Sequence, residues 1–200
     1  MQLQELESRV AHGDHVTPPL PLLAMTDAPS LHRLAAESWS RNKYPTQAVT
    51  PGGPKPPQSE KIRIGYFSMD FYSHVVGLLV ADLIESHDRD KFEIIAFSYG
   101  PDSGDYVRKR LEKAFDVFLD VRDKSDEYIA ALSRSFGIDI AIDLAGFTAG
   151  SRTGIFARRA APLQANYLGY PGTMGADYID YIIADPTVVP EASRNFYAEK

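Results

Sequence analysis

The sequence predicts an α/β protein, a doubly wound, Rossmann-like parallel sheet preceded by a short helical segment. From residue 61 onward, apolar segments of strand length alternate with segments of helical periodicity. The strand-like segments are almost continuously apolar, which is typical of parallel strands buried on both faces. Strands that alternate with helices indicate a parallel sheet with helices packed on both of its sides.

The predicted elements follow one another closely along this part of the chain. Six strands are expected at 62–67, 92–99, 115–121, 138–144, 163–170 and 178–184. Helices are expected at 75–87, 105–114 and 125–136, with a short helix at 151–159. Ser125 followed by Asp126 and Glu127 is a favourable helix start, because a capping hydroxyl precedes acidic residues at the positive end of the helix dipole.

The chain before residue 61 differs in composition. Residues 1–44 are predicted to be a helical segment, in which two helices flank a proline-rich turn, TPPLPLL. In the second helix we expect Asp27 to cap and Pro29 to occupy the first turn. Residues 45–60 hold five prolines and two glycines, which can sustain neither a helix nor a strand ladder, and are predicted to link this segment to a lobe at 61–200.

Composition and charge exclude several classes of protein. The chain is 44% hydrophobic and 24% charged, which is ordinary for a globular protein, and its net charge of −6 argues against a nucleic-acid or anionic-membrane surface. Without cysteine there is no disulfide or thiolate site, and no histidine pair follows H-E-x-x-H, so we expect no metal site. No apolar run approaches the ~20 residues that cross a bilayer, and the N-terminus lacks signal-peptide features; a cytoplasmic protein is expected.

Chemistry in an open α/β sheet is expected beyond the carboxyl ends of the strands. Asp70 and His74 follow the first strand, as a loop carboxylate and an imidazole at the start of a helix. A helix N-terminus favours an anion and disfavours a protonated imidazole, so the pair suits phosphate binding or proton transfer. The alternative is that Asp70 caps the helix and His74 is a polar residue at the edge of the core.

Two glycine-containing loops follow later strands. In LAGFTAGSRTGIF, three glycines are spaced by four residues, and Thr148, Ser151 and Arg152 could reach a ligand; the alternative is a flexible turn. In NYLGYPGTMGADYIDY, the segment Tyr170-Pro171-Gly172-Thr173 is a rigid turn that contacts a ligand or only joins two strands. Asp143, in IDIAIDL, is either a buried acid or a structural residue.

Several segments together resemble one family. RIGYFSMDFYSH, DKFEIIAFSYGPDSGD, GIDIAIDLAGFTAGSR and FARRAAPLQANYLGYPGTMGADYIDYIIAD are similar to the catalytic region of the nucleocytoplasmic O-GlcNAc transferase family, which includes plant SPINDLY-like and bacterial members. The resemblance covers about residues 61–200. The segment VTPPLPLLAMTDAPSLHRLAAESW resembles the helical segment that joins the family's tetratricopeptide repeats to its catalytic part, although no such repeat is visible here.

The resemblance implies a GT-B fold, of which this chain is expected to be a truncated N-terminal lobe; the C-terminal lobe would supply most of the nucleotide pocket. Asp70, Phe71 and His74 match the family's D-F-x-x-H element, whose histidine lies near the donor diphosphate and sugar. Val75 and Val76 stand where animal members often have Pro-Thr. A base histidine is implied in the helical segment, where His12 and His15 are nearest and His15 is the candidate.

The implied function is an inverting, metal-independent transfer of GlcNAc from UDP-GlcNAc to Ser or Thr hydroxyls of proteins. The resemblance implies no cofactor besides the nucleotide-sugar donor; its partners would be that donor, a protein or peptide acceptor and the second lobe, with no nucleic acid or membrane. The 200-residue chain alone is expected to be inactive. The alternatives are a non-catalytic lobe that binds an acceptor or partner, and a family member that uses fucose or glucose.

Overall fold

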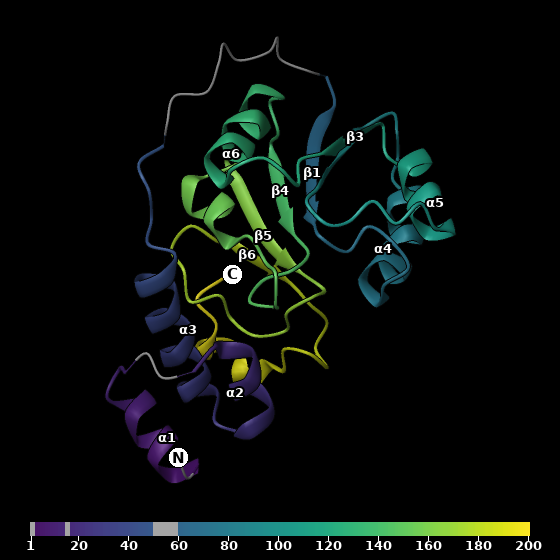
Figure 1. Ribbon diagram of the computed structural model, residues 1–200. Helices are drawn as coiled ribbons and strands as arrows, with labels where there is room; N and C mark the ends of the chain where they lie inside the picture. Colours follow the sequence, from purple (N-terminus) through teal and green to yellow (C-terminus); the bar gives the residue numbers. More distant parts are fainter. Residues whose placement is uncertain (1–2, 15–16, 50–59) are drawn as a thin grey trace.

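A computed structural model describes residues 3–14, 17–49 and 60–200 (Figure 1). Six parallel strands form one sheet in the order β3-β2-β1-β4-β5-β6. The strands are β1 (Ile62–Ser68), β2 (Phe92–Ser98), β3 (Val117–Asp120), β4 (Ile140–Asp143), β5 (Leu163–Tyr167) and β6 (Tyr181–Ile183). The order runs outward from β1 in one direction and from β4 in the other, so the sheet is doubly wound and the predicted α/β, Rossmann-like class is confirmed.

Helices cover both faces of the sheet (Figure 1). The α-helices are α1 (Leu3–Ala11), α2 (Pro19–Met25), α3 (Pro29–Lys43), α4 (Val75–Glu85), α5 (Tyr106–Ala114) and α6 (Asp126–Ser135), and 3-10 helices are η1 (Thr153–Arg158) and η2 (Glu191–Phe196). One core cluster lies under α4 and α5, whereas the other lies under α6, η1 and α3. Successive residues of each strand therefore alternate between two separate apolar layers.

Strands β2 to β6 end one to three residues earlier than the apolar pattern predicts, whereas β1 ends one residue later, at Ser68. β5 stops at Tyr167 because Leu168 takes a left-handed conformation with φ of 70°, which breaks the extended backbone. β3 begins only at Val117, since Phe115 is the C-cap of α5 and donates its N–H to Leu111. The predicted short helix at 151–159 forms as the 3-10 helix η1, and Ser125 caps α6 as predicted, accepting from the Tyr128 N–H.

The helical segment differs from prediction in two places. The proline-rich stretch expected to be a turn contains α2, because Pro19 and Pro21 fall in its first turn, where a helix amide has no internal partner. The N-cap of α3 is Ala28 instead of Asp27, and it provides no side-chain cap, while Pro29 lies in the first turn as expected. No helix among the described residues is long and apolar enough to cross a membrane.

The helical segment is docked on the lobe beside the later strands, away from α4 and α5 (Figure 1). Ser40 Oγ donates to the Met174 carbonyl at 2.7 Å, and Tyr178 Oη donates to the Tyr44 carbonyl at 3.1 Å. These contacts join α3 to the chain between β5 and β6. The boundaries at residues 44 and 60 remain predictions, since residues 50–59 lie outside the described part of the chain.

Candidate functional site

The carboxyl edge of the sheet carries a cavity of about 810 Å³. Residues from the ends of β1, β2 and β3 and from the loop after β4 line it, among them Met69, Asp70, Tyr99, Arg122, Lys124 and Arg152. This edge is where the first and second candidate segments of the sequence meet. The cavity therefore lies where ligands of open α/β sheets bind.

His74 is the N-cap of α4, so it lies at the entrance of that helix and not inside its first turn. Its Nδ1 accepts the Val76 N–H at 3.3 Å, and its side chain is 39% exposed. When the imidazole is neutral with its proton on Nε2, Nδ1 is the acceptor that this contact requires. The positive end of the α4 dipole favours the same neutral form.

Asp70 lies beside His74 but does not cap the helix, so the proposed capping role of Asp70 is wrong. Its Oδ1 is 3.6 Å from His74 Nδ1, and its side chain is only 6% exposed. Burial raises the pKa of the Asp70 carboxyl, and the charge of His74 acts in the opposite direction. His74 Nδ1 thus has two alternatives: it accepts from Val76 when the ring is neutral, or it donates to Asp70 when the ring is protonated. Such a pair can take up and release a proton.

The loop that carries Asp70 and His74 is held by ring packing in the core and by a hydrogen bond to the start of α5. Phe71 is fully buried, and its ring contacts those of Phe115 and Phe118 at centroid distances of 5.3 and 5.8 Å. Asp105, the N-cap of α5, accepts the Ser73 N–H at 2.9 Å through its second oxygen. Asp105 was not singled out from the sequence, where only its capping position could have drawn attention to it.

The loop after β4 reaches the same cavity, but its side chains are engaged within the chain. Arg152 Nε donates to Asp126 Oδ1 at 2.7 Å and Nη2 to the Lys124 carbonyl at 2.6 Å. Thr148 Oγ1 donates to the Ala145 carbonyl at 2.9 Å. In this structure Arg152 fixes the loop against α6, and its contact with a ligand remains a prediction.

The segment 170–173 is mostly buried. Tyr170 is 1% exposed and Thr173 is 2% exposed, and Thr173 Oγ1 donates to Glu199 Oε2 at 2.7 Å. Pro171 is exposed, whereas Gly172 is buried against the Tyr170 ring and Leu23 of α2. The structure thus brings this turn next to the helical segment, and Pro171 is its exposed residue.

The remaining predicted site residues are Val75, Val76 and His15, and they differ in exposure and in whether the structure describes them. Val75 is 60% exposed at the start of α4, whereas Val76 is 6% exposed and packs in the core. His15 lies outside the described residues, and its neighbour His12 bonds the Ser8 carbonyl through Nδ1 at 2.6 Å. Among the described residues no group of three or more acidic or histidine side chains could hold a metal ion.

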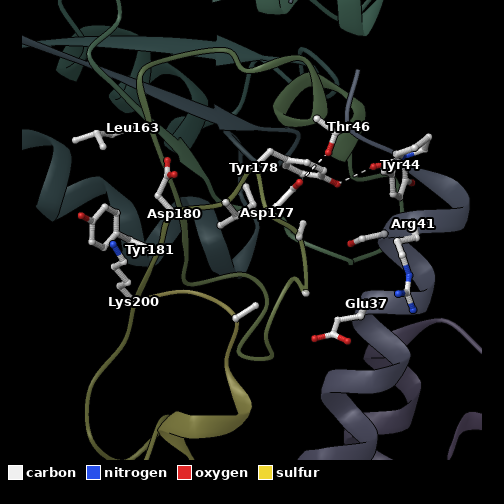
Figure 2. Close-up of a pocket in the computed structure, with 16 residues that line it drawn as sticks. Glu37, Arg41, Tyr44, Thr46, Leu163, Asp177, Tyr178, Asp180, Tyr181 and Lys200 are labelled. Carbon is white, nitrogen blue, oxygen red and sulfur yellow. Dashed lines mark hydrogen bonds between the residues drawn. The ribbon is translucent and has the colours of Figure 1, made fainter. Parts of the chain in front are cut away.

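A second cavity, of about 770 Å³, lies at the opposite edge of the sheet (Figure 2). It is bounded by Leu163 and Tyr181, the first residues of β5 and β6, and by α3. Figure 2 shows Tyr178 and Asp177 directed toward Tyr44 and Thr46, with Thr46 Oγ1 donating to Asp177 Oδ1 at 2.7 Å. None of the predicted site residues lines this cavity, which belongs to the joint between helical segment and lobe.

Curated proteins similar to this chain are named as glycosyltransferases. The probable UDP-N-acetylglucosamine–peptide N-acetylglucosaminyltransferase SEC of Arabidopsis thaliana is 37% identical over 141 residues, which is 70% of this chain and 14% of that protein. The UDP-N-acetylglucosamine–peptide N-acetylglucosaminyltransferase of Caenorhabditis elegans is 36% identical over 146 residues, covering 70% of this chain and 12% of the relative. The chain therefore spans a small part of these relatives.

A solved structure and a family profile cover more of the chain. A mutant of the Thermobaculum terrenum O-GlcNAc transferase matches with a TM-score of 0.80 and 29% identity, over 100% of this chain and 40% of that one. Because the match covers the whole chain, it includes the helical segment. It confirms the predicted resemblance to the O-GlcNAc transferase family and the Rossmann-like lobe of a GT-B fold. The profile of glycosyl transferase family 41 matches residues 47–200. The chain belongs to glycosyl transferase family 41.

Proposed function

We propose that this chain is the N-terminal lobe of a protein O-glycosyltransferase that moves GlcNAc from UDP-GlcNAc to Ser or Thr hydroxyls. The proposal rests on membership of the family, on the activity for which the relatives are named and on one local observation. That observation is the position of His74 as the N-cap of α4, with the buried Asp70 carboxyl 3.6 Å from its Nδ1. A second lobe would close over the carboxyl edge and complete the site.

The reaction has two requirements, and the described residues supply part of each. The leaving diphosphate must be stabilised, and the N-terminus of α4, together with the Nε2–H of His74, presents donors to an anion. We propose that protein donors of this kind stabilise the diphosphate without a metal ion. The acceptor hydroxyl must lose a proton, which we propose passes to the Asp70–His74 pair. As the hydroxyl oxygen bonds to the sugar carbon, the bond from that carbon to the diphosphate breaks and the configuration at the carbon inverts.

Asp70 fits the role of proton partner to His74. When Nδ1 of His74 is protonated, it no longer accepts from the Val76 N–H. It can donate instead to the Asp70 carboxylate, whose Oδ1 is 3.6 Å away. The carboxylate then stabilises the imidazolium against the unfavourable helix dipole. His74 and Asp70 are accordingly the proposed catalytic pair.

The sugar is the finer part of the proposal. Val75 presents an exposed apolar surface beside His74, and neither Val75 nor Val76 has a hydroxyl to bond a sugar. GlcNAc remains the proposed sugar because the relatives are named for it. A screen of UDP-GlcNAc, GDP-fucose and UDP-glucose with the complete enzyme tests this, and exclusive use of another donor would refute the choice of sugar.

The catalytic pair is tested by His74→Ala in the complete enzyme. We expect transfer to fall about tenfold or more with folding retained, since positioned acid–base groups contribute at least this much. His87→Ala is the matched control, because His87 follows the other end of the same helix and contacts Tyr66 and the Leu83 carbonyl. Unchanged turnover of His74→Ala would remove the site assignment. No transfer by the wild-type enzyme with any donor would favour a lobe that only binds.

A further inference from the structure

Two buried oxygens without hydrogen-bond donors lie on neighbouring strands. Asp143 at the end of β4 and Asn166 near the end of β5 are register partners, on parallel strands that run ~4.8 Å apart. Their sequence neighbours Ile142 and Ala165 both belong to the core under α4 and α5. Asp143 and Asn166 therefore share the other face of the sheet, and their side chains lie side by side there.

The orientation of the Asn166 amide is determined by its donor. Nδ2 donates to the Tyr170 carbonyl at 2.8 Å, so Oδ1 is the atom left for another partner. Asn166 is 0% exposed, and Oδ1 has no partner among the described residues. Turning the amide over would place two oxygens against each other at the Tyr170 carbonyl, so the amide oxygen stays unpaired.

Asp143 likewise has one buried side-chain oxygen without a hydrogen-bond partner among the described residues. It is 1% exposed, its Oδ1 accepts the Ala145 N–H at 2.9 Å, and its Oδ2 has no partner in the described part of the chain. Two buried acceptors beside each other cost free energy unless one of them carries a proton. A protonated carboxyl supplies that proton, because its O–H is a donor.

The surroundings of Asp143 favour protonation. Burial raises its pKa from 3.8 to about 6, and only the backbone N–H groups of Ala145 and Gly146 act to lower it. The ionisable side chains facing it are the phenols of Tyr99 and Tyr178, whose own pKa values are raised by burial and by the Asp143 charge. Both phenols are uncharged near neutral pH, so neither compensates a carboxylate.

We propose that Asp143, in its protonated form, donates its Oδ2–H to Asn166 Oδ1 and so joins the loops that follow β4 and β5. Asp143 holds the first loop through Ala145, and Asn166 holds the second through Tyr170. The two loops also touch directly, since a Cβ on Gly146 would lie 2.4 Å from Tyr170 Cβ. Asp143 is thus a positioning residue for the carboxyl edge, whichever sugar the enzyme uses.

The first test is a carbon-13 NMR titration of the side-chain carboxyls in the 200-residue chain. We expect the Asp143 carboxyl carbon to titrate near pH 6, and the Asn166 side-chain amide signals to shift with it. Titration of Asp143 below pH 4 would overturn the proposal. This measurement needs no substrate, so its failure is separate from a failure of the proposed glycosyl transfer.

The second test compares variants by denaturant unfolding between pH 4 and pH 7. Because folding raises the Asp143 pKa, its protonated form stabilises the fold, and this contribution is lost as the pH rises from about 4 through 6. Asp143→Asn keeps a donor toward Asn166, so its folding equilibrium relative to wild type should improve about a hundredfold over that range. Asp102→Asn, which changes an exposed Asp in the loop after β2, is the control and should not gain a hundredfold over the same range.

The third test concerns the competing donor. Tyr99 Oη is also buried without a partner among the described residues, and it could donate to an ionised Asp143 instead. We expect Tyr99→Phe to leave the Asp143 titration in place. A large rise of the Asp143 pKa in Tyr99→Phe would show that Tyr99 is the donor and would refute the acid–amide bond.

Discussion

Gly77 is the position at which the geometry of the Asp70–His74 loop can be tested most directly. Gly77 lies in the first turns of α4, with the loop folded back onto it. A Cβ added there would lie 2.3 Å from the Tyr72 carbonyl oxygen and 2.6 Å from that of Asp70. Both oxygens belong to backbone, so the loop would have to move by about 1 Å to reach ordinary contact distance.

The free energy of Gly77→Ala combines two opposed effects. Alanine in place of glycine inside a helix stabilises by about 1 kcal/mol. Forcing a methyl group into occupied space costs about 1–3 kcal/mol. We therefore expect a net loss of about 1 kcal/mol in the free energy of unfolding. Displacing a catalytic group by about 1 Å can lower turnover about a hundredfold, so activity should suffer far more than stability.

The assay pairs urea unfolding of the chain with sugar transfer by the complete enzyme. Leu79→Ala is the matched control, because Leu79 is on the same helix but 60% exposed, and it should change neither quantity much. A Gly77→Ala protein that is stabilised by about 1 kcal/mol and fully active would show that the loop does not pack on the helix.

Two further variants test how the same loop is held. Phe71→Ala should lower the free energy of unfolding by about 3–5 kcal/mol, measured by urea denaturation, because a fully buried ring leaves a cavity; a loss below about 1 kcal/mol would contradict its burial. Asp105 has its pKa lowered to about 2 by hydrogen bonds from Arg108, Ser103 and Ser73, so its ionised form stabilises the fold above pH 4. The stability advantage of wild type over Asp105→Asn should therefore shrink as the pH falls from 4 toward 2, and a constant difference would argue against these bonds.

The fold could be predicted from the sequence because local patterns and the sheet agree. Continuous apolar runs alternating with amphipathic helices leave few alternatives to a parallel, doubly wound sheet. The ends of the strands were less predictable, since Leu168 is apolar and leaves β5 only through its backbone angle. α2 was missed because prolines were counted as helix breakers, although both lie in the first turn where they cost little.

The candidate site was predictable only where its residues are close in sequence. Asp70 and His74 share one loop, and the rule that ligands bind beyond the carboxyl ends of strands predicts their location. The support from Asp105 depends on how α5 packs beside that loop, which no local pattern encodes. The pairing of Asp143 with Asn166 requires knowing that β4 and β5 are neighbours and in which register, and a single asparagine in an apolar strand was the only signal.

The position of the two acids in the sheet explains why they behave differently. Asp70 follows β1 and Asp143 ends β4, and these are the adjacent strands between which the winding direction reverses. The crevice at such a reversal is where α/β proteins bind ligands. Asp70 lines the cavity and has His74 beside it, so a proton can move between them. Asp143 faces an amide and two phenols in the core, so its proton has no better acceptor. One acid is thus suited to exchange protons beside the cavity, and the other, in its protonated form, to hold the two loops together.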